Sequence, residues 1–243
     1  MKELDRLVYR RQYVLAPEKI DCPFIHQTYS ISDTYVLYAH SDLEVSEYKN
    51  EDRRLLLLGD IFDYENSSKN NTGILKDLAT SGIDGIAEMT AKYTGRFVLI
   101  LMEKERIILL HDSIAYKKIY YSIRKKKLWF SSHPHLLAKI LDLRSTEDPS
   151  KLEFYNSADF VRLSNSNLGD TTYFDDIRQL MPNHYYDVTA NHIVRFWPSD
   201  KIKRIGLEEA THRCAAMVKW YMESIANRYK IMLPVTSGYD SRL

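Results

Sequence analysis

Two consecutive β-hairpins in the middle of the chain constrain the fold more than any other feature. The segments RFVLILM and RIILLHD (96–102 and 106–112) flank a charged turn, and KIYYSI and KLWFSS (118–123 and 127–132) flank a basic turn. β-Branched and aromatic residues pack well on pleated sheets, and short polar turns join antiparallel strands. The region predicts an antiparallel sheet. Its basic turn at 124–127 reads as a solvated hairpin turn, because no aromatic residues extend it into a nucleic-acid surface.

The pattern outside this region predicts further strands and several helices. Strands are expected at 13–15, 34–38 and 54–59, with two short ones around 181–183. Helices are expected after Thr72 as the capping residue, over 85–93 with Gly95 closing the helix, from Pro134 to Ile140, and over 148–157.

A change of pattern follows residues 196–199, FWPS, which read as a linker. Apolar residues then recur at spacings of three and four, at Leu207, Ala210, Cys214, Met217, Tyr221 and Ile225. This spacing predicts one long amphipathic helix with Cys214 in the core, followed by a strand at 231–235. We therefore expect an antiparallel α+β domain over residues 1–200 and the beginning of an α/β unit over residues 201–243.

Composition excludes several classes of function. The chain carries 34 basic and 33 acidic residues, so its balance does not point to nucleic acid or to an anionic membrane. We see no apolar segment of the length that a membrane span or a signal peptide requires. The two cysteines, Cys22 and Cys214, lack metal-ligand spacing and imply no disulfide framework. We expect a cytoplasmic protein without a metal site of its own.

The last eleven residues, LPVTSGYDSRL, place a small polar loop directly after an apolar run. Such a loop presents backbone N–H groups at a sheet edge, where a following helix would add its positive dipole end, and phosphates bind at such places. It is not a Walker A loop. Considered alone, the loop is better explained as an ordinary turn in which Asp240 or Ser241 caps a helix.

The same loop resembles the PP-loop of asparagine synthetases and related ATP pyrophosphatases, which reads S-G-G-x-D-S. The corresponding positions here are Thr236, Ser237, Gly238, Tyr239, Asp240 and Ser241. Threonine keeps the hydroxyl of the first serine. Ser237 replaces a glycine that would allow close backbone approach to phosphate.

Five upstream segments resemble the N-terminal domain of the same family, in order, so that the resemblance covers residues 55–243. Residues 111–121, HDSIAYKKIYY, resemble R-D-x-x-G-x-K-P-L-Y-Y, with Asp112, Lys117, Tyr120 and Tyr121 kept and a glycine replaced by Ala115. The other four segments are GRF at 95–97, FSSHPHLL at 130–137, TTYFDDIRQLMPNHYYDV at 171–188, and the pair FW at 196–197.

The resemblance implies an amidotransferase of class II fold, an N-terminal-nucleophile-hydrolase-like arrangement of stacked antiparallel sheets flanked by helices, followed by a truncated PP-loop domain. It implies an ATP-dependent enzyme that activates a carboxylate substrate as an acyl-adenylate, releases pyrophosphate and forms an amide. Thr236, Ser237, Gly238, Asp240 and Ser241 would cradle the pyrophosphate of ATP with Mg²⁺. We expect this activity of a longer parent, and not of residues 1–243 alone.

The first domain departs from the family at its glutaminase site. The family's nucleophile is a cysteine exposed as the first residue, and this chain has Lys2 there. The stretch 59–64, GDIFDY, resembles G-E-I-Y-N-Y, and Asp63 stands where we expect an amide donor to the oxyanion. No acidic residue for the amino group of glutamine stands at 71–73. These differences predict an inactive glutaminase and no catalytic residue.

Two other functions remain open. The domain would be a non-catalytic module that binds a peptide or partner, or a hydrolase whose nucleophile Cys22 is exposed by cleavage after Asp21. Pro23 stands where the family has glycine, which disfavours the hydrolase, and a buried cysteine is more often structural. We read His111, His133 and His135 as caps or surface residues rather than metal ligands.

Overall fold

The computed structural model describes residues 7–85 and 89–232. Within these ranges two six-stranded sheets are formed, and every pair of neighbouring strands is antiparallel. The first sheet has the order β10 (Arg178–Gln179), β8 (Tyr120–Arg124), β9 (Lys127–Ser131), β1 (Tyr13–Ala16), β3 (Val36–His40) and β2 (His26–Ser30). The second has the order β12 (His192–Arg195), β11 (His184–Asp187), β7 (Arg106–His111), β6 (Tyr93–Glu103), β5 (Arg53–Asp63) and β4 (Val45–Lys49).

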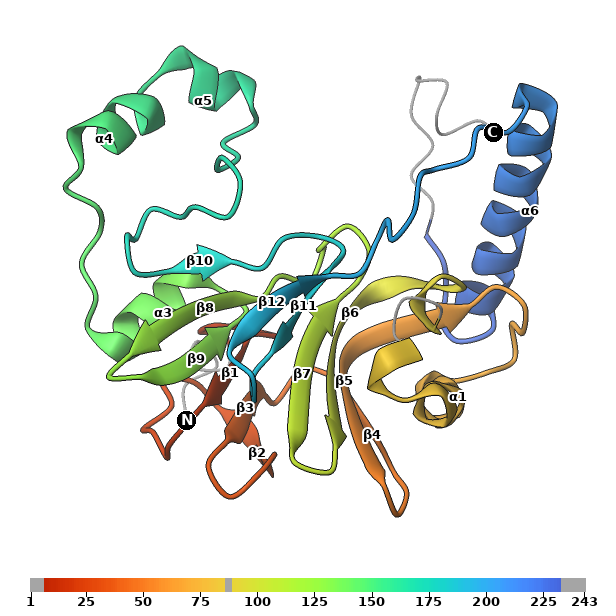
Figure 1. Ribbon diagram of the computed structural model, residues 1–243, viewed down its shortest axis with the longest axis horizontal. Helices are drawn as coiled ribbons and strands as arrows, with labels where there is room; N and C mark the ends of the chain where they lie inside the picture. Colours follow the sequence, from red (N-terminus) through yellow and green to blue (C-terminus); the bar gives the residue numbers. More distant parts are fainter. Residues whose placement is uncertain (1–6, 86–88, 233–243) are drawn as a thin grey trace.

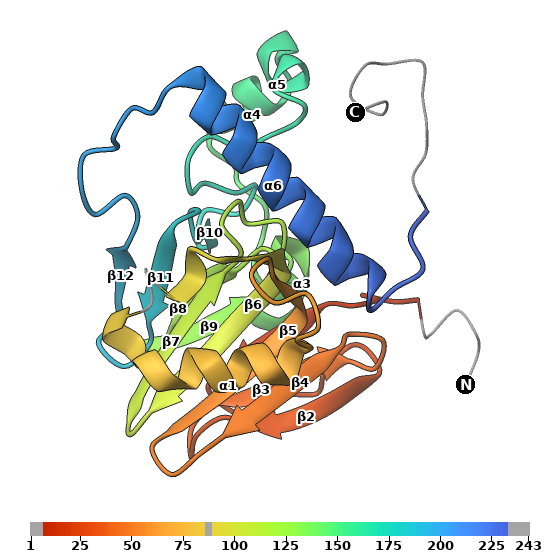
Figure 2. The ribbon, with the colours of Figure 1, turned by 90° about the vertical axis from the view of Figure 1, so that its right-hand side faces the viewer.

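The two sheets pack face to face, and a helix covers the outer face of each. The core between them joins residues of both sheets, including Leu15 and Phe130 from the first and Leu56 and Ile100 from the second. Helix α1 (Asn71–Ser81) packs on the outer face of the second sheet, and α3 (Pro134–Leu141) packs on the first. Figures 1 and 2 show the resulting layers of helix, sheet, sheet and helix.

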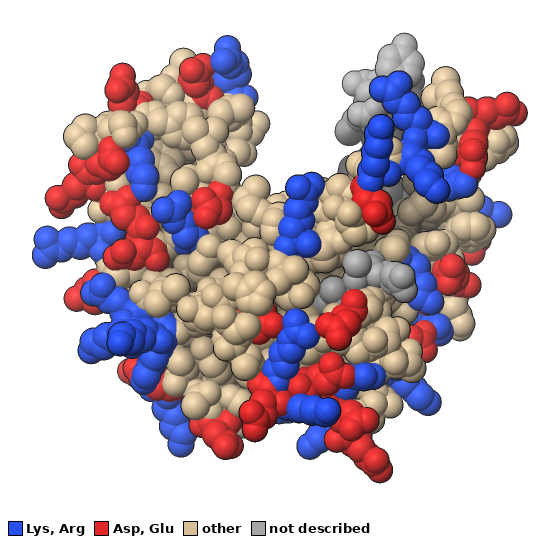
Figure 3. Space-filling model, in the orientation of Figure 1, with Lys and Arg blue, Asp and Glu red and all other residues tan. Residues whose placement is uncertain are grey.

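Two helical projections leave this body on the same side (Figure 1). The short helices α4 (Pro149–Tyr155) and α5 (Ala158–Arg162) form one of them and bury none of their residues. Helix α6 (Leu207–Ala226) forms the other. A hollow lies between the projections, and much of the charge on this face gathers on them and along its lower part (Figure 3). A short 3₁₀ turn, η2 (Ile83–Gly85), follows α1.

The predicted hairpins are confirmed as β6–β7 and β8–β9, and the other predicted strands of the first domain as β1, β3, β5, β10 and β11. Alternation explains why β5 reads as a continuous apolar run: Leu56 and Leu58 face the inter-sheet core, whereas Leu55 and Leu57 face α1. Because β5 is covered on both faces, neither face requires polar residues.

The helices after Thr72, from Pro134 and over 148–157 are also confirmed as α1, α3 and α4. Thr72 is not the cap, because the side chain of Asn70 accepts the hydrogen bond from the backbone N–H of Gly73. The prediction of a helix over 85–93 is wrong at its C-terminal end, because Tyr93 and Gly95 belong to β6. Residues 86–88 lie outside the described ranges.

The long helix after the linker is confirmed, but its expected buried face is not. Ser224 is the buried residue of α6, and Cys214 is exposed, so the prediction that Cys214 lies in the core is wrong. The reason is that α6 meets the rest of the described chain mainly at its C-terminal end. The strand at 231–235 is absent at residues 231 and 232, and its remaining positions lie outside the described ranges. No helix within those ranges is both long and apolar enough to cross a membrane.

Candidate functional site

A cleft of about 910 Å³ opens where one end of each sheet meets the loop between β7 and β8. The chain segment that enters β1, the turn before β4, strands β5 and β6, and the residue Tyr229 after α6 all contribute to its wall. The charged side chains that line it are the cations Arg10, Arg11, Arg96, Lys117 and Lys118 and the acids Asp42, Glu44 and Asp60. A cleft of this size accommodates a small-molecule ligand.

Two glycines bring β5 and β6 unusually close at the cleft. Gly59 has φ +103 and Gly95 has φ +144, a backbone region that L side chains rarely adopt. A Cβ on Gly95 would lie 2.1 Å from the carbonyl oxygen of Asp60, and one on Gly59 would lie 2.3 Å from that of Arg96. The register that results pairs Asp60 with Arg96, so these opposite charges face the cleft from adjacent strands.

The loop that carries Lys117 is held by a buried carboxylate. Asp112 accepts hydrogen bonds from the backbone N–H groups of Tyr116, at 2.8 Å, and of Lys117, at 2.9 Å. Ala115 within the loop has φ 54, so the chain turns through the left-handed region where the resembling motif has glycine. Lys117 then extends over Gly59, and its Cδ lies 3.4 Å from the point that a Cβ on Gly59 would occupy. Desolvation in the cleft lowers the pKa of the Lys117 ammonium.

The hydroxyl and imidazole groups on the opposite wall serve structural roles. The Ser132 hydroxyl accepts from the backbone N–H of Tyr13, at 2.8 Å, and lies 3.2 Å from the Tyr13 carbonyl oxygen to which it donates. His133 caps α3 by accepting from the backbone N–H of His135. Burial lowers the pKa of His133, and the neighbouring His135 adds to this effect.

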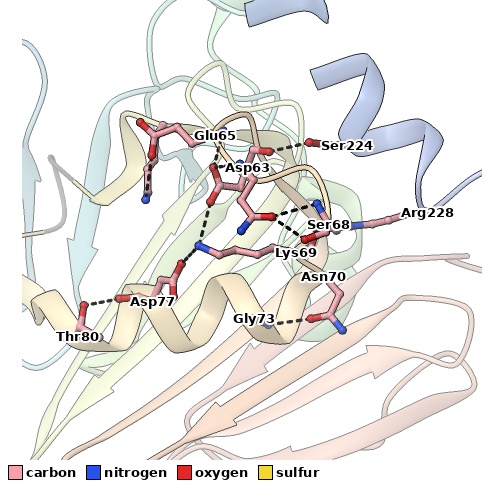
Figure 4. A network of polar contacts seen from close by, with 12 residues as sticks. Asp63, Glu65, Ser68, Lys69, Asn70, Gly73, Asp77, Thr80, Ser224 and Arg228 are labelled. Carbon is pink, nitrogen blue, oxygen red and sulfur yellow. Dashed lines mark hydrogen bonds and ion pairs between the residues drawn. The ribbon is translucent and has the colours of Figure 1, made fainter. Parts of the chain in front are cut away.

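The C-terminal end of α6 and the residues just after it hold the end of β5 and the loop between β5 and α1. We call these contacts, made by Ser224, Asn227 and Arg228, the clamp. The Ser224 hydroxyl donates to the Asp63 carbonyl at 2.6 Å, and Asn227 donates to the Ser67 carbonyl at 3.1 Å. Arg228 donates to the Ile61 carbonyl and to Asn71 Oδ1, each at 2.8 Å, and also to the Lys69 carbonyl. Figure 4 shows Ser224 and Arg228 reaching this loop from α6.

Aromatic contacts reinforce the clamp. The guanidinium of Arg228 lies 4.6 Å from the centre of the Phe62 ring, and Trp220 stacks on Tyr64 with ring centres 5.7 Å apart. The hydroxyl of Tyr229 donates to Asp60 Oδ1 at 2.6 Å, and Tyr229 thereby joins the clamp to the cleft. Burial lowers the pKa of Arg228, and its Nε has no hydrogen-bond partner among the described residues.

The structure brings some of the predicted site residues together and leaves others untested. Thr236, Ser237, Gly238, Asp240 and Ser241 of the expected pyrophosphate loop lie outside the described ranges, as does Lys2. Lys117 of the resembling motif lines the cleft together with Gly59 and Asp60 of the second motif, and the buried Asp112 accepts from the backbone N–H of Lys117.

The interpretation of Asp63 as the residue at an oxyanion position does not agree with its surroundings. Asp63 is buried and does not line the cleft. Its carboxylate accepts from the backbone N–H groups of Glu65 and Asn66 and pairs with Lys69 at 3.4 Å, as Figure 4 shows for the Asp63 and Lys69 side chains. Asp63 therefore shapes the loop that α6 clamps, and its neighbours Gly59 and Asp60 face the cleft instead.

Cys22 also lies apart from the cleft. It is half-buried against the cluster that α3 covers on the first sheet. Burial raises the pKa of its thiol to about 11, which disfavours the thiolate that a nucleophile requires. His111 is buried between two backbone carbonyls and is not a surface residue, and the described residues contain no group of three or more side chains placed to hold a metal ion.

No pattern in the sequence indicated that several residues would belong to the cleft or the clamp. Arg228 and Tyr229 follow a helix whose spacing predicted only a long apolar face. Their partners lie far earlier in the chain, at Ile61, Lys69 and Asp60. Arg96 stood inside a segment that matched the resembling family, but the match was to its neighbours Gly95 and Phe97.

Comparison with known proteins identifies the family to which the chain belongs. A family model described as a glutamine amidotransferase domain matches residues 56–197, more than half of the chain. The chain therefore belongs to the glutamine amidotransferase domain family. No curated protein matches it.

One solved structure that is similar to the chain is the glutamine phosphoribosylpyrophosphate amidotransferase of B. subtilis, complexed with ADP and GMP. Its TM-score is 0.44 and its sequence identity is 10%, over 83% of this chain and 46% of that chain. The present chain thus spans less than half of the length of that enzyme.

Removing the guanidinium of the clamp should free the loop between β5 and α1. We expect Arg228→Ala to speed amide hydrogen exchange in residues 64–70 at least about tenfold, because hydrogen bonds from a charged donor stabilise by roughly 1.5–3 kcal/mol. Exchange in β6 and β7 should not change. The matched control is Arg213→Ala, since Arg213 is exposed on the same helix and pairs with Glu209 four residues away. Equal exchange in both variants would show that Arg228 does not hold the loop.

Proposed function

We propose that this chain is the amidotransferase-type module of an asparagine synthase-like, ATP-dependent enzyme that forms amide bonds, and that the module does not hydrolyse glutamine. Membership of the glutamine amidotransferase domain family supports the first part. The order of the resembling segments, ending in the loop at 236–241, supports the link to a carboxylate-activating partner domain.

The observation that carries the second part is the course of the chain into β1. An N-terminal nucleophile requires a free α-amino group beside a thiol or hydroxyl at the reacting position. Here the residues that line the cleft before β1 are Arg10, Arg11 and Gln12, and they lie inside a continuous chain.

The two cysteines do not supply the missing group. Cys22 does not line the cleft, and Cys214 is exposed on α6. Ser132 does line the cleft, but its hydroxyl is engaged by the backbone of Tyr13 on both its donor and acceptor sides. None of the described cleft residues therefore combines a nucleophile with a neighbouring base. Nitrogen would reach the partner domain as free ammonia or as a substrate amine.

In this proposal the cradle for pyrophosphate is formed by Thr236, Ser237, Gly238, Asp240 and Ser241. Backbone N–H groups of such a loop, at the start of a helix, stabilise phosphate oxygens. ATP with Mg²⁺ and a carboxylate are the substrates, and a parallel sheet beyond residue 243 would order the loop. The alternative is a non-catalytic module that binds a partner, and the excess of cations in the cleft favours a binding role.

The purified protein should produce no glutamate from glutamine. The reason is the absence of an N-terminal nucleophile among the described residues of the cleft, and the measurement is release of glutamate over time beside an active amidotransferase. Cys22→Ser is the companion variant, which we expect to behave as the unaltered protein. Turnover above about 1 per second, an ordinary enzymatic rate, would contradict the proposal. Loss of that turnover in Cys22→Ser would assign it to the hydrolase alternative.

A parent chain that continues past Leu243 should exchange pyrophosphate into ATP in the presence of its carboxylate substrate. Asp240→Ala should abolish the exchange, because Asp240 is the carboxylate of the loop and would orient the loop or the metal. Ser237→Gly should preserve or improve ATP binding, because glycine allows closer backbone approach to phosphate. Unchanged exchange in Asp240→Ala would place the pyrophosphate site elsewhere.

A further inference from the structure

We propose that the cleft binds a small oxyanion ligand with at least two negative charges, and that Lys117 and Arg96 are its principal contacts. This inference rests on the proposed function and deepens it, since it assigns a ligand class to a cleft that does not hydrolyse glutamine. The ligand chemistry is that of clustered carboxylate or phosphate oxygens.

The charge balance of the cleft is the first argument. Five cationic and three acidic side chains line it, which leaves an excess of two positive charges. Two of the acids already have partners of their own. Asp42 pairs with Arg10 at 2.8 Å, and Glu44 accepts from the Asn71 amide at 3.4 Å.

Asp60 is the acid that faces Arg96 across the strands, and Tyr229, which follows α6, donates to it. Its Oδ1 accepts the Tyr229 hydroxyl at 2.6 Å, and no ion pair between Asp60 and Arg96 forms within 4 Å. The guanidinium of Arg96 instead lies 5.1 Å from the centre of the Tyr116 ring, in a cation–π contact. The Asp60 carboxylate is thus hydrogen-bonded to Tyr229 and makes no salt bridge with Arg96.

Lys117 is the most constrained of these cations. It is partly buried, and its backbone is fixed by Asp112. Burial is the largest influence on its ammonium and disfavours the charged form, and repulsion from Arg96 and Arg11 acts in the same direction. Asp60 attracts the ammonium, but within the described residues Lys117 forms no salt bridge. A buried charge without a close counter-ion is costly, and a bound anion would supply that counter-ion.

The same geometry disfavours a neutral zwitterion such as glutamine. Its ammonium group would meet the repulsion of Lys117 and Arg96, whereas an oxyanion with two or more charges is attracted to both. A guanidinium binds paired carboxylate or phosphate oxygens in a bidentate manner, and an ammonium adds a point charge. Arg11, whose backbone has φ 58, adds a third cation at the rim.

Isothermal titration calorimetry of the full chain with pyrophosphate, citrate and glutamine tests the proposal. We expect saturable one-to-one binding of pyrophosphate or citrate and none of glutamine. Preference between the two anions distinguishes a phosphate ligand from a carboxylate ligand. Lys117→Met and Arg96→Gln should each weaken binding at least about tenfold. Lys76→Met on α1 and Arg124→Gln at the β8–β9 turn are the matched controls, because both residues are exposed outside the cleft, and they should bind as the unaltered protein does.

The outcomes separate the two proposals. Lys117→Met should fold with an unchanged or raised melting temperature in the absence of anion, so weaker binding would not reflect unfolding. Equal weakening by the control variants, or no binding of either anion, would overturn the assignment of the site. Release of glutamate by a protein that binds the anion through Lys117 would refute the proposed function and leave the anion site standing.

Discussion

The pairing of β5 with β6 is the contact on which the cleft depends. These strands run side by side over eleven residues each, from Arg53 opposite Glu103 to Asp63 opposite Tyr93. Two glycines, one on each strand, allow the backbones to approach at one end of the ladder, where any side chain would collide with a carbonyl oxygen. The close approach places an acid and a cation on one rim. A register shift of one residue would turn both away from the cleft, because successive strand residues face opposite sides.

Helix α6 converts this rim into a defined site. Its C-terminal end binds loop carbonyls through Ser224, Asn227 and Arg228, and so satisfies polar backbone groups that would otherwise be left unpaired beside the protein body. Tyr229 extends the same set of contacts to Asp60. The remaining length of α6 is largely exposed, so its C-terminal end and the residues just after it provide most of its contact with the protein body.

Sequence reasoning predicted the parts of the fold that local patterns determine. Alternating β-branched and aromatic residues identified the two hairpins, and Pro134 identified the start of α3. Cys214 was misplaced because helical spacing indicates an apolar face but not whether a partner covers it. The contacts of Asp63 were not predicted, because a motif gives the position of a residue along a strand and not the hydrogen bonds that its carboxylate makes. The cleft itself was harder to predict from the sequence. The contacts of Arg228 and Tyr229 span more than 150 residues, and no spacing rule within one sequence predicts them.

The central claim is that Tyr229, which follows α6, holds the carboxylate of Asp60 at the rim of the cleft. A double-mutant cycle with Asp60→Asn and Tyr229→Phe, measured by urea unfolding, tests it most directly. A partly exposed hydrogen bond to a carboxylate predicts a coupling free energy of about 1 kcal/mol between the two substitutions. Additive effects, with a coupling below roughly 0.3 kcal/mol, would contradict the claim and show that Tyr229 does not hold Asp60.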